Sequence, residues 1–314
     1  MSGLGEETRM TDELVESLLV GVVDTHVHSG PSTAPRALDH IEMIQQAAAV
    51  GYRAIVTKDH YYSGAPLAAL VNAHFGELGT TMISGVSLNN AVGGLNPYAV
   101  EHSAAMGGRI VWLPTFTSRN HLAWQETEAQ YTHPGVSAAT APTLPVLPVD
   151  VLTPTGEVVD ELKRVLDVMA QSDQVLAGGH LHANEIKVVF AEAIRRGVTR
   201  LLVLHPEEIV RAGLDDVAEF AALGAYVEHS MNLFVTDSRF KLYETPLLHD
   251  YIEAAGVDRT ILASDLGQAD NVSPIEGMRE TIRICLSLGY SPDEIRQLTS
   301  RNAAALLGLD DLAP

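Results

Sequence analysis

The feature that most constrains the fold is a regular alternation of short β-branched runs with longer amphipathic segments. Each short run has four or five mostly apolar residues, which is typical of strands buried on both faces of a parallel sheet. Eight runs follow this pattern: 21–24, 53–57, 81–84, 109–113, 174–177, 200–204, 225–228 and 260–263. Eight βα units in one chain predict a closed (β/α)₈ TIM barrel, with a doubly wound open sheet as the alternative fold.

The segments between the runs repeat apolar residues at helical spacing, as Ile186, Val189 and Phe190 do. Residues 1–20 are predicted to form a short leading helix. Residues 291–314 are predicted to form closing helices, because Ser291-Pro-Asp-Glu294 has the pattern of a helix cap. With no internal repeat and no separate domain in view, residues 1–314 are interpreted as a single barrel domain.

One connection is much longer than the others. Residues 115–155 follow the fourth run, are rich in Pro, Thr and Ala, and lack helical periodicity. A long connection of this kind is often a lid, and here it would rise over the C-terminal face of the barrel. The alternative is a surface excursion or a contact between subunits, and we expect a homo-oligomer. The segment contains His121, Trp124, Tyr131 and His133.

Composition narrows the range of partners. The chain has 40 acidic and 20 basic residues and a net charge of −20, which argues against binding to nucleic acid or to an anionic membrane. The N-terminal residues show no signal peptide, and no apolar stretch is long enough to span a membrane. The single cysteine, Cys285, lies in an apolar helical run and is interpreted as a core residue. We therefore expect a cytoplasmic protein that acts on a small molecule.

Side chains that bind metals or move protons follow these runs where each predicted strand ends. They are His26 and His28 after the first run, Lys58 and His60 after the second, His180 and His182 after the fifth, His205 after the sixth, and Asp265 after the eighth. The carboxyl ends of barrel strands open on one face, where active sites lie. Side chains two apart on a strand share a face, so His26 and His28 should converge. Converging imidazole and carboxylate groups predict a metal site.

A His-x-His motif after the first run, single histidines after the fifth and sixth, and an aspartate after the eighth resemble the amidohydrolase superfamily, and residues 299–308 resemble its closing helix. The chain looks similar to an uncharacterised family of amidohydrolase-like proteins. The resemblance implies a metal-dependent hydrolase with one or two divalent ions, zinc first, with manganese or iron as alternatives. It implies a metal-activated hydroxide that attacks an amide, a cyclic amide or another C–N bond of a small molecule. The alternatives are hydrolysis of a lactone or phosphate ester, metal-dependent decarboxylation, and a barrel that binds metal without catalysis.

The resemblance also assigns roles to individual residues. It implies that the metal ligands are His26, His28, His180, His205 and Asp265. Asp265 would in addition take a proton from the water and deliver it to the leaving group. Apart from the resemblance, a metal or His60 is expected to stabilise the developing oxyanion. His60 shares a face with Lys58, and its alternatives are a metal ligand, a substrate contact and a surface residue.

Three further residues are predicted to contact the substrate. Asn89 follows the third run, and its amide can donate to a carbonyl or carboxylate. Glu228 ends the seventh run. His182 shares a face with His180, and its alternatives are a hydrogen-bond donor behind the ligands or the first residue of a helix.

One departure from the superfamily pattern concerns the residue that bridges two metals. Many binuclear members use a carboxylated lysine or a glutamate after the fourth strand, but residues 114–118 read Pro-Thr-Phe-Thr-Ser. Lys58 is the comparable residue here. The pKa of a lysine falls readily on burial, so a neutral Lys58 amine could add carbon dioxide and become a bridging carbamate. The alternative is an ammonium that binds an anionic substrate beside a single metal.

Overall fold

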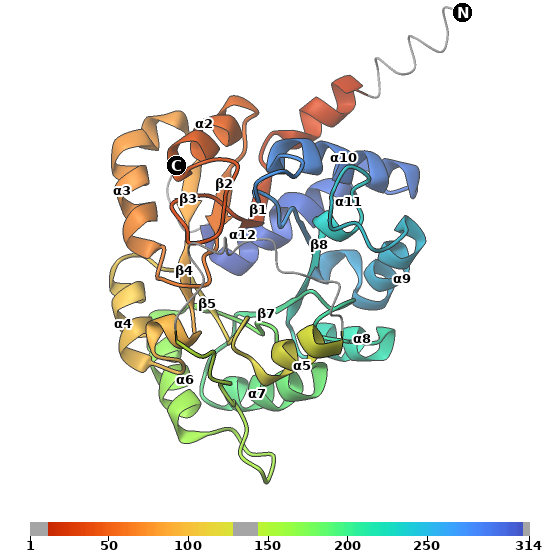
Figure 1. Ribbon diagram of the computed structural model, residues 1–314. Coiled ribbons are helices and arrows are strands. Elements are labelled where there is room, and N and C mark those ends of the chain that lie inside the picture. Colours follow the sequence, from red (N-terminus) through yellow and green to blue (C-terminus); the bar gives the residue numbers. More distant parts are fainter. Residues whose placement is uncertain (1–11, 128–143, 310–314) are drawn as a thin grey trace, which may run out of the picture.

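The chain forms a barrel of short parallel strands in a computed structural model that describes residues 12–127 and 144–309 (Figure 1). The strands are β1 (Val23–Val27), β2 (Ala54–Thr57), β3 (Thr81–Ile83), β4 (Gly85–Ser87), β5 (Ile110–Trp112), β6 (Val175–Ala177), β7 (Leu201–Leu204), β8 (Tyr226–Ser230) and β9 (Thr260–Ala263). All neighbouring strands pair in parallel, in the orders β1-β2-β3 and β4-β5-β6-β7-β8-β9.

The predicted strand 81–84 is divided into β3 and β4 around Ser84. The backbone N–H of Arg109 donates to the Ser84 carbonyl at 2.9 Å, and the Ser84 hydroxyl donates to the Thr57 carbonyl at 2.7 Å. Gly85 follows, and a Cβ there would lie 1.8 Å from the Ile110 carbonyl oxygen. The close approach of β5 therefore requires glycine at the bend, and β3 and β4 together serve as one strand of the barrel.

The circle closes between β9 and β1. The backbone N–H of Asp265 donates to the His26 carbonyl, and that of His28 donates to the Leu266 carbonyl, both at 2.8 Å. Val27 and Leu266 form a parallel bridge. These contacts lie just beyond the end of β9, so they join the two edges at the C-terminal face. The barrel is the predicted fold.

Helices surround the strands as an outer ring (Figure 1). They are α2 (His40–Ala49), α3 (Ala65–Phe75), α4 (Pro97–Ala105), α5 (Arg119–Thr127), α6 (Asp160–Ser172), α7 (Ala183–Arg195), α8 (Leu214–Ala222), α9 (Thr245–Ala255), α10 (Pro274–Ser287), α11 (Pro292–Arg296) and α12 (Asn302–Leu307). Residues 12–19 are also helical. Short 3₁₀ turns lie at Gly76–Leu78, Asn90–Val92, Met231–Leu233 and Val257–Arg259, and a π-helical turn at Gln297–Arg301 leads into α12. None of the helices described here is long and apolar enough to cross a membrane.

Apolar side chains fill the barrel in two layers. One buried cluster fills the interior of the barrel and includes Val23, Val56, Trp112 and Leu202 of the strands and Leu307 of α12. Two larger clusters lie between the strands and the surrounding helices. The polar side chains at the carboxyl ends of the strands therefore lie next to a closely packed apolar core.

Strand β1 is not regular, and its irregularity directs the first metal-binding motif. Val23 lies in the inner cluster and Val27 in an outer one, although residues four apart in a regular strand share a face. The pairing register with β2 shifts between Asp24 and Val27. A bulge at this place reverses the alternation. As a result, Thr25 and His26 both contact the carboxylate of Glu228 on β8.

The long connection after β5 differs from the expected loop without helix. It contains α5, which carries the buried residues His121 and Trp124. Its backbone also bridges Ser118 to Val149 and Leu152 to Val158. Because α5 lies over the mouth of the barrel rather than along the core, it lacks an apolar stripe at helical spacing. Tyr131 and His133 lie outside the described residues.

Candidate active site

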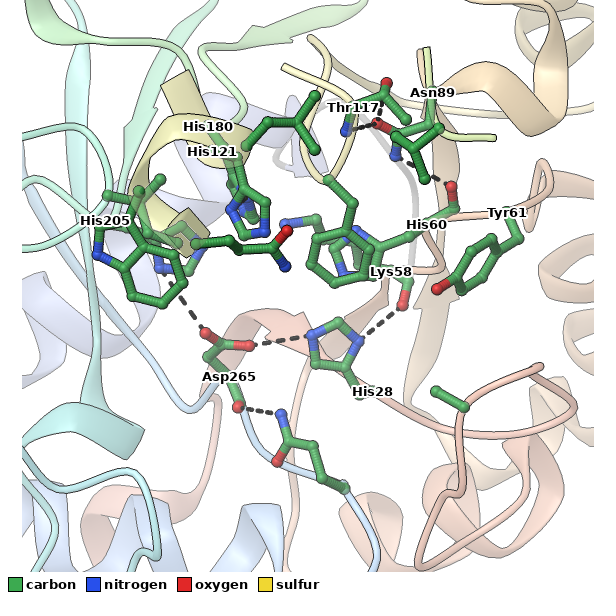
Figure 2. Close-up of a pocket in the computed structure, with 18 of the residues that line it drawn as sticks. His28, Lys58, His60, Tyr61, Asn89, Thr117, His121, His180, His205 and Asp265 are labelled. Atoms are coloured by element: carbon green, nitrogen blue, oxygen red, sulfur yellow. Dashed lines mark hydrogen bonds and ion pairs between the residues drawn. The ribbon is translucent and has the colours of Figure 1, made fainter. Parts of the chain in front are cut away.

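Three side chains from the two strands that close the barrel converge at its mouth. Nitrogen atoms of His26 and His28 and a carboxylate oxygen of Asp265 lie within 4.8 Å of one another, and all three residues are buried. His26 Nε2 lies 3.3 Å and His28 Nε2 lies 3.0 Å from Asp265 Oδ1. His205 approaches the other carboxylate oxygen, with 3.7 Å between Nδ1 and Oδ2 (Figure 2).

The partners behind the imidazoles determine which ring atom carries the proton. His28 Nδ1 lies 2.9 Å from the Lys58 carbonyl oxygen, which can only accept, so Nδ1–H donates. His26 Nδ1 lies 2.9 Å from Glu228 Oε1, and the carboxylate accepts there in the same way. In both neutral rings Nε2 is then an acceptor, and it faces Asp265. Metal-bound histidines in general donate their other ring N–H to a carboxylate or a carbonyl, as Nδ1 of both rings does here.

The donor set fits a divalent metal ion. Burial lowers the pKa of His26 to about 3 and that of His28 to about 4, so both rings are neutral near pH 7. Two acceptor nitrogens then lie against the acceptor oxygen of Asp265, and such an arrangement is unfavourable unless a cation lies between them. Two imidazoles and one carboxylate with an open side are the ligands of a catalytic zinc-type site.

His180 and His205 line the same pocket as the three donors. His180 Nδ1 lies 3.0 Å from His121 Nδ1 of α5, and its buried Nε2 has no hydrogen-bond partner within the part of the chain that the structure describes. His205 Nδ1 lies 2.8 Å from the Ser230 hydroxyl. Burial holds the pKa of both rings well below the ordinary value, so they also offer neutral nitrogen ligands.

Backbone strain marks two of these positions. His205 has a φ of 49° and Asp265 a φ of 51°, in the left-handed region that favours glycine. Strained non-glycine residues persist where the surrounding structure fixes them, and they cluster at functional sites. The carbonyl of Asp265 accepts from Asn232 Nδ2 at 3.0 Å and from Gln268 Nε2 at 2.9 Å, which holds this strained residue in place.

Lys58 lies at the end of β2 on the floor of the pocket. Its side chain is buried, with Nζ 3.3 Å from His26 Nε2 and 5.9 Å from the centre of the Trp112 ring. Burial lowers the pKa of this amine to about 8, against the opposing influence of Asp265 and Glu228. A substantial neutral fraction is therefore available near physiological pH.

His60 and Asn89 lie on the opposite wall from His205 (Figure 2). His60 stacks on Phe116 with ring centres 3.8 Å apart, and its Nδ1 lies 2.8 Å from the Thr115 hydroxyl. Asn89 donates to the His60 carbonyl and to the Thr115 hydroxyl, and its carbonyl oxygen accepts from both Thr115 and Thr117. Asn89 lines the pocket, but its hydrogen bonds tie together the loops after β2, β4 and β5.

Two predicted substrate contacts lie away from the pocket. Glu228 is fully buried behind His26, where its second oxygen accepts from the Thr25 hydroxyl at 2.5 Å. His182 is the N-cap of α7 and accepts from the Asn184 backbone at 3.2 Å. The structure thus places Glu228 as a hydrogen-bond partner of His26. It places His182 at the start of a helix, which is one of the two alternatives to a substrate contact given for it above.

The pocket above these groups has a volume of about 530 Å³, a size suited to a small molecule. Its walls are largely apolar and include Phe116, Trp124, Ile209, Leu233 and Phe240. Sequence reasoning did not select Arg36 or assign a role to His121, both of which line it. Neither residue lies directly after a strand, so the position of the strand ends does not predict that they belong to the site.

Comparisons with known proteins agree with this architecture. The model of a family of unknown function, DUF6282, matches residues 21–228. No curated protein matches the chain. An amidohydrolase from Pseudomonas aeruginosa is 11% identical with a TM-score of 0.63, over 95% of this chain and 99% of that one. The probable dipeptidase PvdM from Pseudomonas aeruginosa is 9% identical with a TM-score of 0.62, over 96% and 98%.

A third similar structure is 2,6-dihydroxybenzoate decarboxylase in complex with 2,6-dihydroxybenzoate. It is 11% identical with a TM-score of 0.54, over 92% of this chain and 99% of that one. At these identities the similarity concerns the fold. The barrel of this chain is the fold of these solved structures, one of which is an amidohydrolase.

Proposed function

The chain belongs to DUF6282, a family of unknown function, and we propose that it is a metal-dependent hydrolase that cleaves an amide, cyclic amide or other C–N bond of a small molecule. The observation that carries the proposal is the contact of two neutral imidazole nitrogens with the carboxylate of Asp265 at the floor of an apolar pocket. A closed structural metal site would not open on a cavity of this size.

His26, His28 and Asp265 would hold the ion, with His180 and His205 completing its coordination or holding a second one. A bound divalent ion would supply a positive charge that polarises a carbonyl and lowers the pKa of a water. Zinc is the first expectation, since imidazole and carboxylate suit it, with manganese and iron as alternatives.

Asp265 is the residue proposed to move the proton. One of its oxygens faces His26 and His28 while the other is turned toward His205, so a water between the donors and the pocket would reach the second oxygen. The carboxylate would take the proton of that water and pass it to the leaving nitrogen. Its main chain is fixed by Asn232 and Gln268, which limits reorganisation during the transfer.

His60 is proposed to stabilise the oxyanion. It lines the pocket, and its ring is held between Phe116 and the Thr115 hydroxyl. Because Thr115 engages Nδ1, Nε2 is the ring nitrogen that we propose contacts the oxyanion. Asn89 fixes both loops that make this contact, so we propose for it an indirect role at the substrate wall.

Turnover by stripped and reconstituted protein tests the proposal. A panel of small amides, cyclic amides, lactones and carboxylic acids would be incubated with protein as isolated, after chelation, and after addition of zinc or manganese. The expected result is hydrolysis that chelation abolishes and metal restores, with ¹⁸O from labelled water in the product. Release of carbon dioxide without ¹⁸O incorporation would instead indicate a decarboxylase, and turnover by rigorously metal-free protein would refute metal dependence.

For Lys58 we propose a carbamate that bridges two ions. The uncharged amine would add to carbon dioxide, forming an N–C bond and releasing one proton, and the resulting anion would offset the repulsion of two cations. Its burial beside His26 and its lowered pKa support this chemistry. We expect Lys58→Ala to bind about one ion in place of about two, and short carboxylic acids to restore part of the loss. Two ions retained in Lys58→Ala would contradict the proposal and leave an ammonium that binds substrate.

A further inference from the structure

Arg36 is fixed at the mouth of the pocket by a short antiparallel pairing. It forms a bridge with Gln268, three residues beyond Asp265. The N–H of Ala37 donates to the Gly267 carbonyl at 3.0 Å, and that of Ala269 donates to the Pro35 carbonyl at 3.2 Å. Residues 35–37 are therefore held against the chain that carries the predicted proton-transfer residue. Arg36 and Gln268 both line the pocket.

The guanidinium of Arg36 is a mostly buried cation without a direct counter-ion. Its Nε is buried and lacks a hydrogen-bond partner, and the side chain makes no hydrogen bond or ion pair with another residue of 12–127 or 144–309. Burial lowers its pKa, and Asp59 and Asp265 oppose this only through the electrostatic field. A buried cation is normally paired, so this donor is suited to an anion from outside the chain.

The size and the apolar walls of the rest of the pocket indicate what kind of molecule fits beside Arg36. Aromatic and aliphatic side chains, among them Phe116, Trp124 and Phe240, form its walls, and its volume is about 530 Å³. Such walls favour an apolar body no larger than a few rings. The chain carries a net charge of −20, which repels anions at a distance, so recognition of an anion must come from local charge such as that of Arg36.

We propose that Arg36 binds the carboxylate of a small organic acid whose apolar body fills the pocket and whose reactive group faces His26, His28 and Asp265. The orientation of the reactive group rests on the proposed function, whereas the binding of the acid does not. A guanidinium presents parallel N–H donors that match the two oxygens of a carboxylate. A phosphate dianion would call for more donors, and Arg36 and Lys58 are the only Arg or Lys side chains among the described residues that line the pocket.

Binding of matched acid and amide probes tests the proposal without any substrate. Benzoate, phenylacetate and 3-phenylpropionate would be titrated calorimetrically into metal-free protein, each against its neutral primary amide. Metal-free protein is used because a carboxylate can also bind a metal ion directly. We expect at least one acid to bind about 10- to 100-fold more tightly than its amide, as charge-assisted bidentate hydrogen bonds allow.

Variants at Arg36 then locate the effect. Arg36→Gln should remove the preference for the acid, and Arg36→Lys should keep part of it because the charge remains. Arg195→Gln removes an arginine that is paired with Glu192 on the exposed face of α7, and it should bind like the wild type. Metal content after reconstitution and circular dichroism should be unchanged in all three variants.

Two results would overturn the assignment. The first is the absence of any preference for an acid over its amide in the wild-type protein. The second is an unchanged preference in Arg36→Gln. Either result leaves metal-dependent hydrolysis standing with neutral substrates, whereas loss of metal dependence with the acid preference intact would refute the proposed function alone.

Discussion

Replacing Glu228 by glutamine should weaken metal binding without touching any predicted ligand. Glu228 accepts a hydrogen bond from His26 Nδ1 at 2.9 Å, so it keeps Nε2 free for the ion and raises the basicity of the ring. A hydrogen bond to a charged acceptor contributes about 1.5–3 kcal/mol, and a neutral one about 0.5–1.5 kcal/mol. The difference of roughly 1–2 kcal/mol corresponds to an increase in Kd of about 5- to 30-fold.

Competition with a zinc-binding dye measures this Kd. The titration should be run at pH 8, since burial raises the pKa of Glu228 to about 7 and the carboxylate is ionised above that value. Glu207→Gln is the matched control, because Glu207 forms an equally buried pair with His229. That variant should lose stability while its Kd for zinc stays that of the wild type. An unchanged Kd in Glu228→Gln, or an equal change in both variants, would refute the reasoning.

Three further predictions concern catalysis, folding and thiol chemistry. Asp265→Asn should lower kcat by about 10²–10⁴-fold in steady-state kinetics, with little change in the Kd of a bound acid measured by calorimetry. Activity within a few fold of wild type would mean that another residue is the base. Asn89→Ala should lower the free energy of unfolding by roughly 1–3 kcal/mol in a urea titration, since it leaves buried polar groups of Thr115 and Thr117 without their partner, and an unchanged midpoint would contradict this. Burial raises the pKa of Cys285 to about 12, so a disulfide reagent at pH 8 should modify it only after unfolding, and rapid labelling of native protein would contradict its place in the core.

The parts of the site that sequence could predict share one property. His26, His28, His205 and Asp265 each follow a local apolar run that is recognisable as a strand in the sequence, and the barrel topology then brings the ends of these runs together. No long-range information beyond the fold class is needed to place them. The same logic located Lys58 beside His26, where its amine lies 3.3 Å from the imidazole.

The parts that sequence could not predict depend on contacts between distant segments. Arg36 owes its position to pairing with residues 267–269, which no periodicity encodes. His121 lies on α5, a helix that packs over the pocket and so lacks the apolar stripe of a core helix. The bulge in β1 turns Thr25 and His26 toward the carboxylate of Glu228. Glu228 is therefore a hydrogen-bond partner of His26, whereas the sequence predicted a substrate contact.

The position of a metal ion in crystals of reconstituted protein tests the central claim most directly. Diffraction data collected on either side of the zinc absorption edge would locate each ion by its anomalous signal. The account predicts a peak about 2.0–2.2 Å from His26 Nε2, His28 Nε2 and a carboxylate oxygen of Asp265. A fully reconstituted crystal whose only ions lie elsewhere, with these three side chains in direct contact as they are here, would contradict it.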